Sequence, residues 1–281
     1  MAVGLNLKDK NMSDSIAFIG GGNMASAIIG GLIRQGISPG KIIVVEPFEP
    51  AQAKLKSDFG ITALEGPSAA LASAALVVWA VKPQSFKEAA LQTRPFTQNA
   101  LHLSVAAGIH SNSMADWLAT QRIVRSMPNT PALIGKGITA LFPREAVTEA
   151  DKKQVEQVIA TTGEFLWLQN ESQLDAVTAL SGSGPAYVFY FIEAMIQAGL
   201  DMGLTREQAS KLAMSTFAGA TELARTSTEP PEVLRQRVTS KGGTTYAAIT
   251  AMEQGNVAAL FISAMQAAQL RAKALGEEFG S

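Results

Sequence analysis

The segment from residue 15 to about residue 36 most strongly constrains the fold of this chain. A β-branched run, SIAFI, passes directly into the turn GGGNMA and then into the helical pattern SAIIGGLI. A G-x-G-x-x-A turn between a strand and a helix is typical of a dinucleotide-binding fold, in which the helix N-terminus faces the pyrophosphate. The first glycine allows the tight turn, the third lets a phosphate approach the backbone, and the alanine permits close packing. We predict that the cofactor contacts Gly20, Gly22, Asn23, Met24 and Ala25.

Apolar runs and helical patterns alternate through the rest of the first half. Strands are predicted at residues 15–19, 41–46, 75–81, 101–105, 122–126, 137–142 and 164–168, and helices at about 22–36, 49–59, 84–93, 111–120 and 148–163. This alternation favours a parallel sheet covered on both faces, with the last two strands completing one edge. We therefore predict an α/β chain in which residues 15–169 form a Rossmann-like, doubly wound, dinucleotide-binding domain.

Strand patterns cease after Gln169. Helices are predicted at about 172–180, 185–199, 206–226, 230–238, 245–253 and 257–275. Residues 170–281 are thus predicted to form an all-α C-terminal domain for substrate binding and dimerisation. Residues 1–14 are polar and lack the apolar run of a signal peptide, so we predict a disordered extension there.

Composition narrows the class of function. The chain is 47% hydrophobic and 17% charged, with a formal net charge of −1, so it can bury a large core and has no electrostatic bias toward nucleic acid. It has no cysteine and two histidines, which excludes thiolate catalysis and disfavours a metal site. No apolar run reaches the roughly 20 residues of a membrane-spanning helix. We predict a cytoplasmic protein that binds small molecules, with no metal, nucleic-acid or membrane partner.

Glu46 ends the second predicted strand, about 20 residues beyond the glycine turn, at the usual spacing for this fold. A carboxylate at that place can accept hydrogen bonds from the adenosine ribose hydroxyls and would repel a 2′-phosphate. The residues that follow, Pro47-Phe48-Glu49, include no arginine. This pattern favours NADH over NADPH; the alternative is that Glu46 simply faces solvent.

Two further strand ends carry residues suited to a cofactor. Small residues at the carboxyl edge of the sheet leave room for a nicotinamide ring, whereas the alternative is ordinary turn chemistry. The candidates are Ala80, Val81, Lys82 and Pro83 after one strand, and Ala106, Ala107 and Gly108 after the next. Of the two histidines, His102 within a strand is predicted to pack in the core and His110 to be exposed.

The predicted helix at 185–199 is apolar nearly all round. Glu193 and Gln197 are its strongly polar positions, so a domain of this size offers little cover for it. Burial at a subunit interface and burial as a central core helix are about equally consistent with the sequence.

The loop SKGGTT precedes the predicted helix at 245–253. Its glycines enter a helix N-terminus, where backbone N–H groups and the helix dipole favour an anion, and Ser240 and Thr244 add hydroxyl donors. An N-capping turn is an equally good interpretation. The helical half has no histidine to move a proton, but a protonated imine accepts hydride directly and needs only a hydroxyl near its nitrogen.

Six motifs resemble the pyrroline-5-carboxylate reductase family over nearly the whole chain from Ile16 onward. They are FIGGGNMASAIIGGL at the start, AVKPQ at 80–84, SVAAGI at 104–109, RSMPNTPALIGKG at 125–137, SGSGPAYVFYFIEAM at 181–195 and VTSKGGTTYAAITAMEQG at 238–255. The last two together are highly specific. Two positions depart from the family pattern: Lys241, where many members have proline, and Glu46-Pro47-Phe48, where others have a small polar or basic residue.

The resemblance implies that NADPH or NADH transfers hydride to C5 of 1-pyrroline-5-carboxylate, giving L-proline. It implies that Thr245 is the catalytic residue, bonded to the ring nitrogen, and that the substrate contacts Ser240, Lys241, Gly242, Gly243, Thr244 and Thr245. It places Met127, Pro128 and Asn129 near the nicotinamide. It also implies homodimers formed through the C-terminal helices, and assembly of these dimers into rings.

Two other classes of function remain open. A β-hydroxyacid dehydrogenase would also place helices after a nucleotide domain, but it needs a catalytic lysine that helix 185–199 lacks. A dinucleotide-binding sensor without chemistry would bind the cofactor and show no turnover.

Overall fold

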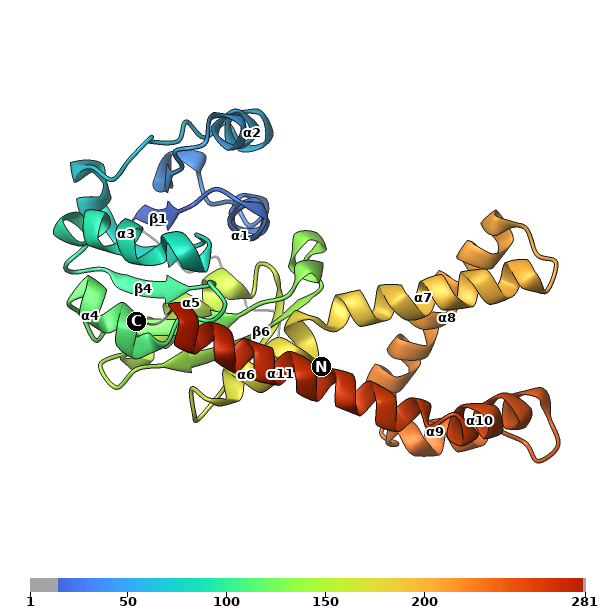
Figure 1. Ribbon diagram of the computed structural model, residues 1–281. Helices are drawn as coiled ribbons and strands as arrows, with labels where there is room; N and C mark the ends of the chain where they lie inside the picture. The colour runs from blue at the N-terminus through green and yellow to red at the C-terminus, as the bar shows by residue number, and fades with distance from the viewer. Residues whose placement is uncertain (1–14, 280–281) are drawn as a thin grey trace. The chain divides into compact units, whose positions relative to one another are not determined.

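The computed structural model describes residues 15–279, so the predicted extension at 1–14 lies outside the described residues. The chain divides into two compact units (Figure 1). The first contains the residues up to Ser183 together with those from Ala268 onward, and the second is Gly184–Ala267.

A seven-stranded sheet forms the centre of the first unit, in the order β2-β1-β3-β4-β5-β6-β7. Its strands are β1 Ser15–Ile19, β2 Ile42–Val45, β3 Ala74–Trp79, β4 Leu101–Ser104, β5 Ile123–Met127, β6 Gly137–Pro143 and β7 Gly163–Trp167. The predicted strands and the doubly wound Rossmann-like sheet are confirmed, with β6 and β7 at one edge.

The chain reverses direction at that edge. β5 pairs with β6 antiparallel, and β7 follows β6 in the same direction. A parallel connection needs a crossover of a dozen or more residues, usually a helix. Residues 128–136 contain only the short 3-10 helix η4, Thr130–Ile134, so the chain turns back on itself.

Helices cover both faces of the sheet because strand side chains alternate in direction. Ile16 and Phe18 point into one core, which α1 (Asn23–Arg34), α2 (Glu49–Phe59) and α5 (Glu149–Ile159) complete. Ala17 and Ile19 point into a second core with α3 (Pro83–Thr93) and α4 (Ser111–Leu118). Three further 3-10 segments lie in the connections: η1 Pro39–Lys41, η2 Ala69–Ser73 and η3 Arg94–Phe96.

The change from strands to helices near residue 169 does not coincide with the division into compact units. α6 (Gln173–Val177) and the π-helical segment η5 (Thr178–Gly182) follow β7, and α6 packs against β5 and β6. Both segments belong to the sheet unit, as do the last turns of α11 (Val257–Phe279).

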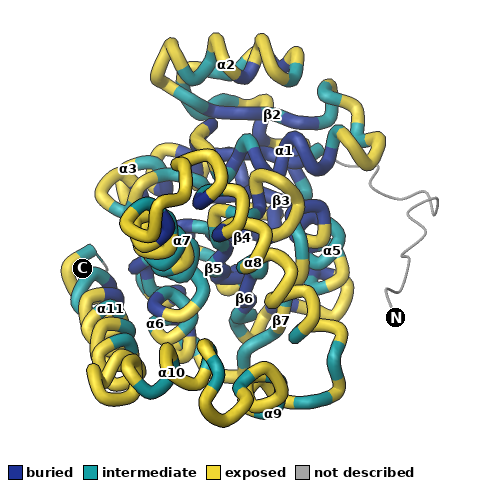
Figure 2. Tube along the Cα trace, turned by 90° about the vertical axis from the view of Figure 1, so that its right-hand side faces the viewer, coloured by how far each residue is buried: buried dark blue, intermediate teal, exposed yellow. Residues whose placement is uncertain are grey.

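The second unit is helical. It contains α7 (Gly184–Asp201), α8 (Arg206–Thr226), α9 (Pro231–Arg237), α10 (Thr244–Gln254) and the beginning of α11. α8 begins with a capping box between Thr205 and Gln208, and Gly199 of α7 packs closely on Ala209 of α8. Most side chains of α7 to α10 are exposed, in contrast to the buried strands of the sheet unit (Figure 2).

Within residues 15–279, no helix is long and apolar enough to cross a membrane. The cytoplasmic location stays a prediction.

Candidate cofactor and substrate sites

The glycine turn is tightly built against the next strand of the sheet. Gly20 has φ +95°, and a β-carbon on it would lie 2.6 Å from the carbonyl oxygen of Ala80. Gly20 N also donates to Val45 O at 2.8 Å. Only glycine adopts this backbone conformation without strain while leaving room for the neighbouring strand end.

Gly22 is different, since a β-carbon there would meet nothing within 4 Å. Gly22 is the N-cap of α1, and no side chain caps this helix. Open space in front of uncapped helix N–H groups is the arrangement that a pyrophosphate requires. The turn therefore fits a dinucleotide.

Glu46 holds the turn in place. Gly21 N donates to its Oε2 at 2.7 Å, and Phe48 N donates to its Oε1 at 2.9 Å. The carboxylate therefore lies at the glycine turn rather than projecting into solvent. Gly21 itself, which is absent from the residues predicted to bind the cofactor, contributes this contact; its signal in the sequence was its place in the middle of three consecutive glycines.

The remaining predicted cofactor residues of the sheet unit follow neighbouring parallel strands. β1, β3, β4 and β5 lie side by side and point the same way, so their carboxyl ends form one edge. This edge brings together the glycine turn and three further groups: residues 80–83 after β3, residues 106–108 after β4, and residues 127–129 at the end of β5. The Asn129 side chain also contacts β6, where its Oδ1 accepts a hydrogen bond from Ile138 N at 3.0 Å.

The SKGGTT loop lies in the helical unit. Gly242 has φ +77°, Gly243 is the N-cap of α10, and no side chain caps this helix. Gly243 N donates to Ser240 O at 3.0 Å, which closes the loop. A β-carbon on Gly243 would lie 2.8 Å from Ser240 Oγ, so the glycine keeps that hydroxyl near the start of the helix. Ser240, Thr244 and Thr245 thus gather around one uncapped N-terminus, as an anion site requires.

His102 packs in the core as predicted, whereas His110 is only partly exposed. His102 is 1% exposed within β4, and its Nδ1 accepts a hydrogen bond from Trp79 Nε1 at 3.0 Å. Burial lowers the pKa of His102 to about 4, so it is neutral. The His110 side chain is 39% exposed, with Nδ1 3.9 Å from Glu171 Oε1.

A doubly wound sheet with an open glycine turn before its first helix, followed by a helical unit, is an arrangement typical of dinucleotide-dependent oxidoreductases. Two family models match the chain: "NADP oxidoreductase coenzyme F420-dependent" over residues 15–108, and "Pyrroline-5-carboxylate reductase dimerisation" over residues 171–275. The pyrroline-5-carboxylate reductase of Pseudomonas aeruginosa is 43% identical over 94% of this chain and 98% of its own length. The chain belongs to the pyrroline-5-carboxylate reductase family.

Solved structures agree with this assignment. A pyrroline-5-carboxylate reductase from Coxiella burnetii has a TM-score of 0.86 and 38% identity, covering 93% of this chain and 98% of its own. A pyrroline carboxylate reductase from Plasmodium falciparum with NADP bound has a TM-score of 0.85 and 27% identity, covering 94% and 98%.

Proposed function

We propose that this chain reduces 1-pyrroline-5-carboxylate to L-proline, the last step of proline biosynthesis, with hydride from NADPH or NADH. The observation that carries the proposal is the loop at 240–245: hydroxyls and backbone N–H groups gather at the uncapped start of α10, in a chain whose family reduces this imine. A cyclic imino acid presents the carboxylate that such a loop binds.

The chemistry needs little from the protein beyond orientation. The protonated imine is already an electrophile at C5, so hydride transfer forms a C–H bond and leaves a secondary amine without a further proton transfer. We assign the carboxylate to Ser240, Lys241, Gly242, Gly243 and Thr244, and the ring nitrogen to the Thr245 hydroxyl. Positioning of the two reactants accounts for most of the rate enhancement expected here.

The glycine turn and the strand ends at 80–83, 106–108 and 127–129 would hold the cofactor, which supplies the hydride. We infer that Glu46 favours NADH, because a carboxylate fixed at the turn by Gly21 N would repel the 2′-phosphate of NADPH. Comparison of kcat/KM for the two cofactors tests this inference. A strong preference for NADPH would contradict it.

We infer that the chain forms homodimers through its helical unit, in line with the dimerisation model that matches residues 171–275. Phe189 and Tyr190 of α7 are 59% and 70% exposed, although such side chains are normally buried. An apolar hollow of about 400 Å³ lies beside them, lined by Tyr187, Tyr190, Phe191, Val257, Leu260, Phe261 and Ala264. A ring of dimers is the larger assembly that the family resemblance implies.

Sedimentation tests the dimer. Phe189→Arg or Tyr190→Arg should shift the protein toward monomer, because a buried, unpaired charge is costly at an interface. Leu91→Arg is the matched control, since Leu91 is an isolated exposed side chain of α3, 50% exposed. Dimers that survive both α7 substitutions would contradict the assignment.

A further inference from the structure

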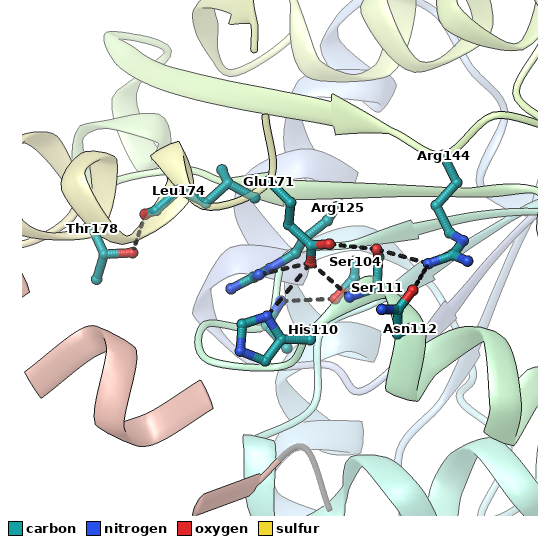
Figure 3. A network of polar contacts seen from close by, with 10 residues as sticks. Ser104, His110, Ser111, Asn112, Arg125, Arg144, Glu171, Leu174 and Thr178 are labelled. Atoms are coloured by element: carbon teal, nitrogen blue, oxygen red, sulfur yellow. Dashed lines mark hydrogen bonds and ion pairs between the residues drawn. The ribbon is translucent and has the colours of Figure 1, made fainter. Parts of the chain in front are cut away.

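The loop that follows β4 has an unusual anchor at its far end. Residues 106–108 lead into α4, which begins at Ser111 and receives no cap from the side chain of its own N-cap residue, His110. Glu171, which lies between β7 and α6, takes that place. Its Oε1 accepts from Ser111 N and its Oε2 accepts from Ser111 Oγ, both at 2.6 Å (Figure 3). A carboxylate at a helix N-terminus satisfies the N–H group and complements the dipole.

Glu171 is itself firmly held. Arg125 Nη1 of β5 donates to Glu171 Oε1 at 2.8 Å, and the Arg125 side chain is only 4% exposed. Burial alone would raise the pKa of the Glu171 carboxyl, but the hydrogen bonds from Ser111 and Arg125 outweigh burial and the net pKa is lowered. The ionised carboxylate therefore bridges the central sheet and the end of the loop.

Other contacts confine the same loop. Arg144 Nη1 donates to Ser111 Oγ at 3.0 Å and to Asn112 Oδ1 at 2.6 Å. At the near end, Val105 N donates to Trp79 O at 3.0 Å. Between these anchors Gly108 has φ +74° and faces Leu275 of α11, whose Cβ would lie 3.3 Å from a β-carbon on Gly108. The position of residues 106–108 thus depends on where Ser111 is held.

We propose that Glu171 is a positioning residue for the cofactor: acting through Ser111, it sets the place of the loop 106–108 against the nicotinamide and does not itself touch cofactor or substrate. This inference rests on the cofactor role proposed for residues 106–108. A charge-assisted hydrogen bond of this kind contributes enough free energy that its loss should weaken cofactor binding about ten-fold, because the loop must be held in place when the cofactor binds.

The chain offers a matched control in Asp151. This carboxylate accepts from Arg122 Nη2 at 2.6 Å and, as the N3 residue of the capping box that begins α5, from Thr148 N at 3.0 Å, with 5% of its side chain exposed. It contacts no part of the loop 106–108. Substitution of either carboxylate by its amide should lower the stability of the protein to a similar degree. Any difference in cofactor binding between the two variants therefore comes from the position of the loop 106–108 and not from lost stability.

The experiment compares the full-length variants Glu171→Gln, Asp151→Asn and Ala107→Val. We measure KM for NADH, NADPH and 1-pyrroline-5-carboxylate, together with amide hydrogen exchange of residues 105–111. Glu171→Gln should raise cofactor KM about ten-fold and speed exchange in the loop, whereas Asp151→Asn should change neither. Unchanged cofactor KM in Glu171→Gln, or an equal rise in Asp151→Asn, would overturn the inference.

The Ala107→Val variant distinguishes the positioning role of Glu171 from the cofactor role of residues 106–108. If Ala107→Val raises the cofactor KM and Glu171→Gln does not, residues 106–108 contact the cofactor but Glu171 does not position them. That result would overturn only the role of Glu171. No effect of Ala107→Val would overturn both. If Glu171→Gln does not fold, Ser111→Ala replaces it and is compared with Asp151→Asn by the same criteria. Ser111→Ala removes the hydrogen bond from the serine hydroxyl to Glu171 and keeps the ion pair between Arg125 and Glu171.

Discussion

A β-carbon on Gly20 would lie 2.6 Å from the carbonyl oxygen of Ala80, whereas the same atom on Gly22 would meet nothing within 4 Å. The turn therefore needs Gly20 for its own geometry and leaves the space beside Gly22 open. The two glycines should respond differently to the same substitution.

Gly20→Ala should lower the free energy of unfolding by roughly 1–3 kcal/mol, because the residue has φ +95° and the added carbon meets backbone. Gly22→Ala should leave stability nearly unchanged and raise cofactor KM, since its methyl group would enter the space assigned to the pyrophosphate. Thermal melting and steady-state kinetics measure both. Equal effects of the two substitutions on stability and on KM would contradict the assignment.

The buried His102 predicts a loss of stability in mild acid. Its pKa is lowered from 6.5 to about 4 in the folded chain, so the unfolded chain binds the proton more readily. The contribution of neutral His102 to the free energy of unfolding is fully present above pH 6.5. It declines as the pH falls toward 4, by about 3 kcal/mol in total. Urea unfolding at a series of pH values measures it.

His102→Asn provides the control for that experiment. An asparagine oxygen can still accept from Trp79 Nε1, but it does not titrate. The dependence of stability on pH between 6.5 and 5 should be weaker in this variant. Identical slopes for the variant and the parent protein would show that His102 is not the group responsible.

Thr245→Ala should lower kcat roughly ten-fold while the dissociation constant for NADH changes little, because the lost hydroxyl serves the substrate nitrogen. Thr245→Ser keeps the hydroxyl and should retain most activity. Stopped-flow turnover and cofactor fluorescence titration separate the two effects. Equal loss of turnover and of cofactor binding would argue against the role assigned to Thr245.

Gly276 lies in α11, where alanine would ordinarily stabilise the helix by about 1 kcal/mol. A β-carbon there would lie 2.6 Å from His110 Nε2, so the imidazole ring must move aside and Gly276→Ala should gain less stability than that. Gly219→Ala in α8, where the added carbon meets nothing, should show the ordinary stabilisation. The melting temperature of Gly276→Ala should therefore lie below that of Gly219→Ala; equal stabilisation of the two variants would contradict the close contact.

Local patterns predicted much of the fold. Short apolar runs marked all seven strands, and capping residues such as Thr148 and Thr205 marked helix starts, since both signals depend on neighbours in the chain. The direction of β6 was not predicted, because it depends on the shortness of the connection rather than on the strand itself.

Residues of the candidate sites were likewise found where the sequence carries a local signal and missed where it does not. Gly20 and Gly22 were found because the glycine turn is a local motif between a strand and a helix, and the loop at 240–245 because it immediately precedes a helix. Glu171 was missed because its partner Ser111 is sixty residues away, and a lone glutamate after a strand carries no local signal of that contact. The apolar character of α7 was visible in the sequence, whereas the exposure of Phe189 and Tyr190 depends on how the helices pack.

Transfer of deuterium from [4-²H]NADH or [4-²H]NADPH tests the central claim most directly. The purified protein is incubated with 1-pyrroline-5-carboxylate and the deuterated cofactor of the transferring stereochemistry, and the product is analysed by mass spectrometry and NMR. We expect L-proline carrying deuterium at C5, and no cofactor oxidation when the imine is omitted. Absence of proline, or proline without deuterium at C5, would contradict it.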